Sequence, residues 1–233
     1  MGLVRTLYAK REKKADFIPV DVVINTLCAV GAKVGSDGPN TSSDDIPIYN
    51  CTSGGKNPLL WGLVEKTVTD NVRDYPLENA LFYPEGGFKE SLLEDRICQF
   101  WLHILPAYII DFLTMIVGGK PMLVKIYQKM RKATSALEAF LTNEWEWTNG
   151  NVDELANSMT KSDSNEFNLD VLRIDWNEFM RSYVLGSRHY LMKNKTDSIK
   201  ESRANLEFLR KRDMMIRCAL VFVFSLAFFY LLF

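Results

Sequence analysis

Apolar residues recur at helical spacing along most of the chain, which predicts a mainly α-helical fold. The first such pattern lies within residues 16–33, where a turn at Pro19 precedes an amphipathic helix. Residues 35–45 are rich in Gly, Ser, Asn and Asp, which predicts a polar loop. The apolar positions of the predicted helix are Val22, Val23, Leu27 and Val30.

One segment in the first quarter of the chain favours a strand. Residues 46–54 carry β-branched and aromatic side chains and run into Gly54-Gly55, a pattern typical of a strand followed by a turn. From Leu60 onward the helical patterns dominate. We therefore expect a small α/β part over residues 1–60 and a helical part beyond it.

Residues 100–117 form a strongly apolar segment in the middle of the chain. Pro106 and Asp111 interrupt it, and a membrane span would have to accommodate both. We expect a buried or membrane-dipping helix here, with a true span as the alternative. Pro121 then predicts the first turn of the next helix.

The helix predicted after Pro121 has an apolar stripe and a basic face. The stripe predicts a helix that faces the core, and a helix lying on a membrane is the alternative. Three lysines lie off the stripe, at Lys125, Lys129 and Lys132. The apolar members are Leu123, Ile126, Tyr127, Met130, Leu137, Phe140 and Leu141.

The end of the chain is apolar on every helical face, because residues 218–233 contain no charged residue. With the apolar residues just before it, the stretch approaches the roughly 20 residues that cross a bilayer. The basic cluster at residues 210–217 would stay in the cytosol under the positive-inside rule. We predict a C-terminal transmembrane helix, a tail anchor, over residues 214–233. A buried final helix is the alternative.

The net charge of -1 argues against a general nucleic-acid binder, which needs a basic surplus. Charge is nevertheless uneven along the chain. Residues 138–178 carry ten acidic and two basic residues, which predicts a solvated acidic surface. Residues 179–217 carry ten basic and four acidic residues, and this block either faces solvent or contacts anionic lipid headgroups. The cysteines, far apart in the sequence, favour a reducing compartment over a disulfide framework: Cys28, Cys51, Cys98 and Cys218.

The sequence contains no complete catalytic motif. A dinucleotide-binding fold needs a glycine-rich turn after its first strand. The glycines between Gly31 and Gly38 instead follow a predicted helix and have a different spacing, so we expect a loop. Short-chain reductases also need Tyr-x-x-x-Lys, in which the lysine lowers the pKa of the tyrosine. None of the nine tyrosines has a lysine four positions later.

The histidines favour structural roles. His103 and His189 have no Cys, Asp or Glu partner at metal-ligand spacing, so we expect each to be structural or exposed. The sequons at Asn40, Asn50 and Asn194 are expected to stay unmodified, because the sequence indicates no route for them into a lumen.

The block around residue 175 also favours packing. Asp170, Arg173 and Asp175 alternate with apolar positions, which predicts a surface ion pair beside a buried Trp176. Trp145 and Trp147 likewise predict packing, or an amphipathic rim near a membrane.

Four sequence blocks resemble the alcohol-forming fatty acyl-CoA reductases. They are KADFIPVDVVIN at residues 14–25, IYNCTSG at 48–54 with Asn57-Pro58, FNLDVLRIDW at 167–176, and GSRHYL at 186–191. The last two are similar to the C-terminal domain of that family. Because the blocks span almost the whole chain in order and spacing, the resemblance is specific, and an insect-like member is expected.

The resemblance implies a function that the motifs alone do not. Members of the family carry an N-terminal Rossmann-type domain that binds NADPH, and they reduce a long-chain acyl-CoA through an aldehyde to a primary fatty alcohol. Gly2 to Thr6 matches a position near the end of that domain, so its glycines and Tyr/Lys pair are expected upstream of Met1. No catalytic, cofactor-binding or metal-binding residue is therefore assigned here. The segment from Asp16 to Asp21 is expected to close the fold and to border the acyl site.

We therefore predict a mainly α fold with a small α/β remnant of a Rossmann-type, extended short-chain reductase domain over residues 1–60. A helical reductase C-terminal domain over residues 61–210 and the tail anchor follow. The expected partners are long-chain fatty acyl-CoA, a lipid bilayer and a second copy of the chain, with no nucleic acid. The expected location is the membrane of the endoplasmic reticulum or peroxisome, with the N-terminal part in the cytosol. The chain alone is expected to be inactive; a non-catalytic, membrane-anchored interaction or regulatory module is the alternative.

Overall fold

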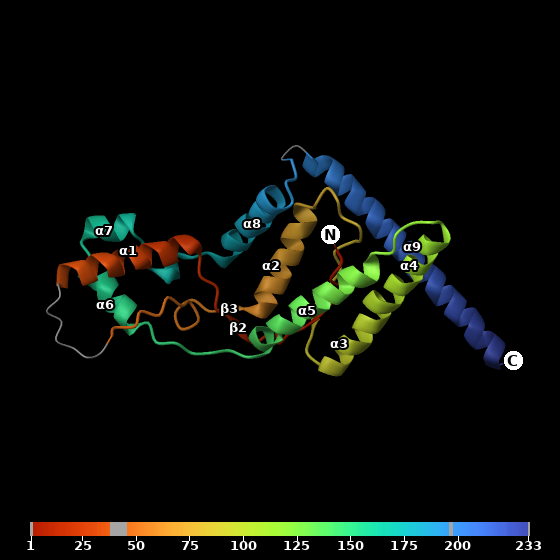
Figure 1. Cartoon of the computed structure of the whole chain (residues 1–233), viewed down its shortest axis with the longest axis horizontal. Coiled ribbons are helices and arrows are strands. Elements are labelled where there is room, and N and C mark those ends of the chain that lie inside the picture. The colour runs from red at the N-terminus through yellow and green to blue at the C-terminus, as the bar shows by residue number, and fades with distance from the viewer. Residues whose placement is uncertain (1, 38–45, 196–197, 233) are drawn as a thin grey trace. The chain divides into compact units, whose positions relative to one another are not determined.

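The computed structural model describes residues 2–37, 46–195 and 198–232, and beyond residue 219 it describes only the side chains of Phe222, Ser225 and Phe229 (Figure 1). Most described residues are helical, which confirms the expected mainly α fold. The chain forms two compact units, each assembled from segments that are distant in the sequence. Unit 1 comprises residues 1–9, 64–138 and 177–233, and unit 2 comprises residues 10–63 and 139–176. The predicted domain division near residues 60 and 210 stays a prediction.

Unit 2 is built around the first helix. Helix α1 (Val20–Asp37) packs against α6 (Gly150–Ser158), and α7 (Lys161–Glu166) and the 3-10 turn η2 (Val171–Arg173) follow. The strands β2 (Lys14–Ala15) and β3 (Leu59–Leu60) form an antiparallel pair. The buried apolar side chains of this unit are Ala15, Val22, Leu59, Leu141, Val152, Leu155, Leu169, Val171 and Trp176.

Helix α1 confirms the predicted helix but extends further than expected. It buries Val22 and Thr26, whereas Leu27 is 62% exposed, so its buried face is narrower than the predicted stripe. The helix continues through Gly31 to Asp37, so the predicted loop in this region is wrong up to that residue. An ion pair of 3.0 Å between Lys33 and Asp37 supports the last turn, and glycine in a helix costs only about 1 kcal/mol. Residues 38–45 of the predicted loop lie outside the described residues.

The strand predicted over residues 46–54 does not form: residues 46–52 have no regular structure, and the predicted turn occupies residues 53–57. The segment is extended and irregular because side chains, rather than a neighbouring strand, bind its polar groups. Thr52 Oγ1 donates to Asn149 Oδ1 at 3.0 Å, and Asn149 Nδ2 donates to the Thr52 carbonyl at 2.9 Å. Asn151 Nδ2 donates to the Ile48 carbonyl at 2.6 Å.

The block around residue 175 packs as predicted. Trp176 is 7% exposed, and Arg173 pairs with Asp170 at 3.6 Å. The indole Nε1 of Trp176 donates to Asn57 Oδ1 at 3.0 Å. Asn57 Nδ2 in turn donates to the carbonyls of Val171 and Ile174, each at 2.9 Å. Asn57 therefore joins two of the sequence blocks that carry the family resemblance.

Unit 1 is mainly helical. Its strands β1 (Thr6–Tyr8) and β4 (Gly87–Lys89) form a parallel pair, separate from the pair in unit 2, so a Rossmann-type remnant stays a prediction. Helices α2, α5 and α8 each contain residues of both units. The helical elements are α2 (Trp61–Asp74), α3 (Leu92–Gln99), η1 (Phe100–Ile104), α4 (Leu105–Ile116), α5 (Leu123–Thr142), α8 (Trp176–Gly186), η3 (Ser187–Leu191) and α9 (Ile199–Leu232).

The elements α3, η1 and α4 form one continuous helix of 25 residues. Ser91 caps its first turn by accepting from the Glu94 N–H, a Ser-x-x-Glu capping sequence. The π turn η1 precedes Pro106, whose ring clashes with the carbonyl four residues earlier in regular α geometry. At the other end Gly118 adopts φ 77°, a left-handed conformation that glycine reaches without strain, and the chain turns into α5. Helix α5 begins at Leu123, two residues later than Pro121 predicted.

The α3–α4 helix is also long and apolar enough to cross a membrane. Within it, an 18-residue window has a mean hydropathy of 1.4, and only 11% of that window is buried. The expectation that residues 100–117 form a buried helix is therefore wrong. The described residues place this candidate span in the middle of the chain rather than at residues 214–233. Most side chains of that tail lie outside the described residues, so the tail anchor stays a prediction, although α9 continues as one helix to Leu232 (Figure 1).

We expect Glu144 to contribute to the acid sensitivity of unit 2. The Lys14 backbone N–H, which donates to Glu144 Oε2 at 3.1 Å, lowers the pKa of this carboxyl below its ordinary value of 4.5. Because the folded pKa is depressed, the stabilisation is complete above the unfolded pKa and is lost as pH falls through the folded pKa. Urea unfolding between pH 7 and pH 3 should therefore show a smaller acid-induced loss of stability in Glu144→Gln than in wild type.

Glu146→Gln is the matched control, because Glu146 lies two residues away and forms an exposed ion pair with Lys14 at 3.3 Å. This variant should keep the wild-type pH dependence. Identical pH profiles for Glu144→Gln and wild type would contradict the assignment.

Candidate functional site

A stripe of mostly polar residues fixes the α3–α4 helix to the rest of unit 1. Every fourth residue of the helix turns inward, whereas most large apolar side chains of the helix are exposed. A spacing of four drifts around a helix of 3.6 residues per turn, and the wider π turn at η1 offsets part of that drift. The members of this polar stripe are Asp95, Gln99, His103, Ala107 and Asp111.

Asp95 joins the helix to strand β1. Its carboxylate is 2% exposed and accepts hydrogen bonds from Thr6 Oγ1 and from Gln99 Nε2, each at 2.6 Å. Both carboxylate oxygens are therefore satisfied within the unit. A buried carboxylate left without such partners would cost several kcal/mol, so Thr6 and Gln99 are needed wherever Asp95 is ionised.

His103 lies in the π turn and is buried, while the structural role expected for it stays a prediction. Its Nε2 accepts a hydrogen bond of 2.9 Å from the Arg5 N–H, so this nitrogen carries no proton. The ring stacks on Tyr127 of α5, with centroids 5.0 Å apart and planes 15° apart. His189, by contrast, is exposed and contacts the Tyr190 ring edge-on. The described residues contain no cluster of side chains that could hold a metal ion.

Asp111 caps the following helix. Its two oxygens accept from the N–H groups of Met122, Leu123 and Val124, at 3.0, 2.9 and 2.9 Å. The N–H groups of a first helical turn have no partner inside their own helix, so this carboxylate satisfies them from α4. The α4–α5 hairpin is thereby closed by one side chain.

A cavity of about 150 Å³ lies between β1, the α3–α4 helix and α5. Burial raises the pKa of Tyr127 in its wall, so the phenol stays neutral at physiological pH. A cavity of this size holds about one benzene-sized group, which is a short part of a long acyl chain. The cavity therefore suits a small, mainly apolar group, and Arg131 is the charged residue of its lining. Its wall includes Val4, Thr6, His103, Ala107, Tyr127 and Met130.

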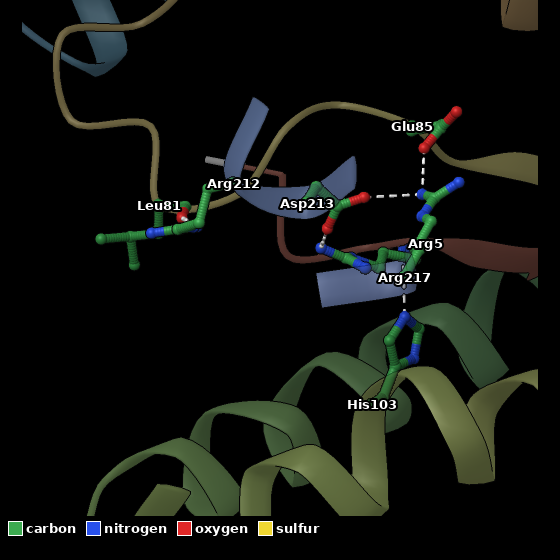
Figure 2. Close-up of polar contacts among 7 residues, drawn as sticks. All are labelled: Arg5, Leu81, Glu85, His103, Arg212, Asp213 and Arg217. Carbon is green, nitrogen blue, oxygen red and sulfur yellow. Dashed lines mark hydrogen bonds and ion pairs between the residues drawn. The ribbon is translucent and has the colours of Figure 1, made fainter. Parts of the chain in front are cut away.

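Arg5 connects the cavity to the long C-terminal helix (Figure 2). The same residue whose N–H binds His103 donates from Nη2 to Asp213 Oδ1 of α9 at 3.0 Å. Asp213 also pairs with Arg217 at 2.7 Å, and Arg217 reaches Glu85. Figure 2 shows Asp213 between the two arginines. This network is the last set of charges before the uncharged end of α9.

Arginines of the basic block bind the protein itself. Arg212 donates to the Leu81 carbonyl at 2.6 Å, and Arg203 donates to the Asp74 carbonyl at 2.8 Å. Because some basic residues of the block at residues 179–217 bind carbonyl groups of unit 1, its positive charge does not require that the whole block contacts lipid. Arg203 is exposed and Arg212 is half-buried, so these hydrogen bonds are compatible with a solvated face, and lipid contact stays a prediction.

The sequence analysis missed the most buried arginine. Arg188 is 4% exposed and donates to the Pro76 carbonyl at 3.1 Å, the Lys195 carbonyl at 2.9 Å and Ser198 Oγ at 2.6 Å. It fixes the segment after α2 to the start of α9. The only signal for it was its place in the GSRHYL block, because periodicity does not single out a charged residue inside a helix.

The remaining candidates take structural positions. Asp16 Oδ1 accepts from the N–H and Oγ of Ser53, at 2.7 and 3.1 Å, and thus ties the segment before α1 to the following turn. A border between this segment and an acyl site stays a prediction. Gly31 and Gly35 lie inside α1, so they form no turn that could cradle a pyrophosphate. The residues at this place therefore do not fit a nicotinamide dinucleotide. All four cysteines are free.

Of the three sequons, Asn194 is buried and Asn50 donates its amide to the Thr148 carbonyl at 3.1 Å, while Asn40 lies outside the described residues. The tryptophans differ from the packing prediction, because Trp145 and Trp147 are both exposed. Trp145 still contacts Phe140, with ring centroids 5.5 Å apart. A membrane rim for the two tryptophans stays a prediction.

We expect Asp213→Ala to destabilise unit 1 by about 1–3 kcal/mol, because it removes the carboxylate that pairs with the half-buried Arg5 and with the exposed Arg217. Thermal unfolding in detergent micelles measures the change. Glu207→Ala is the matched control on the same helix, because its pair with Arg210 is exposed, and it should cost less than about 0.5 kcal/mol. Equal melting temperatures for the two variants would show that the network does not fix α9.

The chain is similar to known proteins over most of its length. Residues 102–194 match the family model described as male sterility protein. The chain is 32% identical over 212 residues to fatty acyl-CoA reductase 1 of Mus musculus. The matched region covers 90% of this chain and 40% of that protein. The chain is 33% identical over 212 residues to fatty acyl-CoA reductase 1 of Xenopus laevis, with the same coverage.

A related reductase gives the same result. The identity to fatty acyl-CoA reductase 2 of Bos taurus is 31% over 222 residues, which covers 95% of this chain and 42% of that protein. The chain thus spans about 40% of the length of the curated relatives it matches. Over nine tenths of its length it is similar to the C-terminal portion of the fatty acyl-CoA reductases, as the four sequence blocks predicted.

Proposed function

We propose that this chain supplies the C-terminal portion of an alcohol-forming, NADPH-dependent fatty acyl-CoA reductase. The reaction converts a long-chain acyl-CoA through an aldehyde to a primary fatty alcohol, a precursor for waxes, ether lipids and other lipids. The observation that carries the proposal is the similarity of 90% of the chain to proteins named fatty acyl-CoA reductase. Because the chain spans only part of those proteins, the activity belongs to the whole reductase.

NADPH supplies the hydride in this proposal, and the residues that bind it belong to another part of the reductase. The fold of α1 supports this division, since its glycines lie inside a helix. The described residues of this chain are proposed to hold the helical domain together and to place apolar surface near the acyl chain. The cavity beside His103 takes at most a short part of that chain.

We further propose that the enzyme is a tail-anchored protein of the endoplasmic reticulum or peroxisomal membrane, with its N-terminal part in the cytosol and with a second copy as a partner. The uncharged sequence after Arg217 and the continuous helix α9 support the anchor. The network at Asp213 would then lie at the point where α9 leaves the folded unit.

A chimera tests the proposed reductase function. We expect the mouse reductase to keep NADPH-dependent alcohol formation from hexadecanoyl-CoA when its matched portion is replaced by this chain, because the two portions have the same role. Product alcohol is measured by gas chromatography. The mouse protein without that portion is the control, and this chain alone should form no alcohol.

A chimera that melts cooperatively and binds NADPH, yet makes no alcohol, would contradict the proposal and favour the non-catalytic, membrane-anchored module. Alcohol formation by this chain alone would instead contradict the assignment of NADPH binding to another part of the enzyme.

A glycosylation tag tests the tail anchor. An acceptor peptide fused after Phe233 should become N-glycosylated in microsomes, because a spanning helix carries it into the lumen. The double variant Phe222→Arg, Phe229→Arg should lose most of this modification, because each arginine costs up to about 3 kcal/mol in the middle of a membrane helix. The same tag placed before Met1 should stay unmodified. A C-terminal tag that is never glycosylated would show that the tail does not cross.

A further inference from the structure

The α3–α4 helix has the reverse of the polarity expected for a helix on a water-soluble protein. Its polar stripe faces inward, and large apolar side chains cover the remaining surface. Helices exposed to lipid carry their ionisable residues toward protein and their apolar residues outward. An exposed apolar area of this extent marks an interaction surface. We define the outer face of this helix by six exposed residues, Leu93, Ile97, Trp101, Tyr108, Phe112 and Ile116.

We propose that this outer face lies along the surface of a lipid bilayer, with the helix parallel to the membrane plane rather than across it. The contact is a second membrane attachment, distinct from the C-terminal tail. Its chemistry is that of an interfacial helix, in which apolar side chains enter the acyl layer and aromatic residues such as Trp101 and Tyr108 lie near the headgroups.

The position of α5 decides between a parallel helix and a span. Tyr127 stacks on His103 with centroids 5.0 Å apart, so α5 runs alongside the middle of the α3–α4 helix. Asp111 holds the start of α5 to α4 through three N–H groups. If the α3–α4 helix crossed a bilayer, Lys125 and Lys129 of α5 would lie at the depth of His103, in hydrocarbon. That placement is strongly unfavourable for lysine.

Both lysines are exposed and neither belongs to the outer face. With the helix parallel to the membrane, they remain in water or at the headgroups, where basic residues gain from anionic lipid. The first turn of α3 supports the same orientation, because Glu94 pairs with Lys89 at 2.8 Å and Arg96 is exposed. When the helix lies parallel to the membrane plane, this charged end can remain in water, as it would on a soluble protein.

The charge network relates this surface to the tail. Arg5 binds His103 on the inner side of the helix and Asp213 of α9, so both apolar elements are attached to the same residue (Figure 2). The α3–α4 helix can therefore lie on the bilayer that the tail enters. This proximity raises the affinity of the outer face for the bilayer, because insertion of the tail increases the effective concentration of the outer face at the membrane surface.

Fluorescence of the full chain in liposomes tests the proposal. The four cysteines are replaced by serine, and a single cysteine at Phe112→Cys or Tyr108→Cys carries an environment-sensitive dye. The liposomes contain phosphatidylcholine with about one third phosphatidylserine, some of it with a nitroxide on the acyl chain. Lys129→Cys is the matched control on α5. The dye at positions 108 and 112 should be quenched several-fold more by the nitroxide lipid than at position 129, and should be protected from aqueous iodide.

Sidedness separates a parallel helix from a span. With Arg96→Cys and Val117→Cys, which lie near the two ends of the helix and outside the outer face, a membrane-impermeant maleimide added outside should reach both ends equally in those molecules whose folded part is outside. A span would protect one end until detergent is added, which would overturn the parallel orientation.

The dye at positions 108 and 112 could stay accessible to iodide while the chain still sediments with the liposomes. This result would overturn the contact of the outer face with the bilayer and leave the tail anchor intact. Protection that follows protein concentration rather than lipid would also overturn it, because a second copy would then cover the face. Reductase activity enters none of these measurements, so the inference stands or falls independently of the proposed enzyme.

Discussion

The carboxylate of Asp111 and the imidazole of His103 hold an otherwise apolar helix to the protein, and the organisation of unit 1 depends on this attachment. Each group accepts hydrogen bonds from backbone N–H groups that have no partner in their own secondary structure. Each contact therefore satisfies two polar groups at once, the buried side chain and a backbone N–H group. Without them the helix would keep the Thr6–Asp95 hydrogen bond near its start, but the apolar contacts of its middle and end do not specify its rotation.

Arg5 and the first residue of strand β1, Thr6, extend this attachment into a network across the unit. These two residues make three hydrogen bonds. The Arg5 N–H donates to His103, the Arg5 guanidinium donates to Asp213, and the Thr6 hydroxyl donates to Asp95. The strand is only three residues long, so its own ladder contributes little stability. Its position is set by the side chains of the helices around it. This arrangement explains why a short N-terminal segment can relate the cavity to the start of the tail.

The proposed functions divide between the parts of the molecule in a consistent way. The small cavity beside His103 is too limited for a complete long acyl chain, and α1 offers no place for a dinucleotide. Apolar surface is instead abundant on the outer face of the α3–α4 helix and at the end of α9. A substrate with a long acyl chain partitions into membranes, so a reductase portion that lies on the bilayer would meet it there. In the proposed enzyme, hydride transfer would take place in the cofactor-binding part.

The sequence by itself determined the features that depend on neighbours along the chain. Helices α1 and α5 follow from apolar spacing, the burial of Trp176 from its block, and the resemblance to a family from four blocks in order. It did not determine features that need a distant partner. The polar stripe looks like interruptions of an apolar run until Arg5 is placed beside His103, 98 residues away, and beside Asp213, 208 residues away. Likewise residues 46–52 have strand composition, but a strand exists only where another offers its backbone, and here Asn149 and Asn151 bind those groups instead. Local pattern fixes which segments become helices, whereas hydrogen-bond partners far along the chain decide which face of each helix is turned inward.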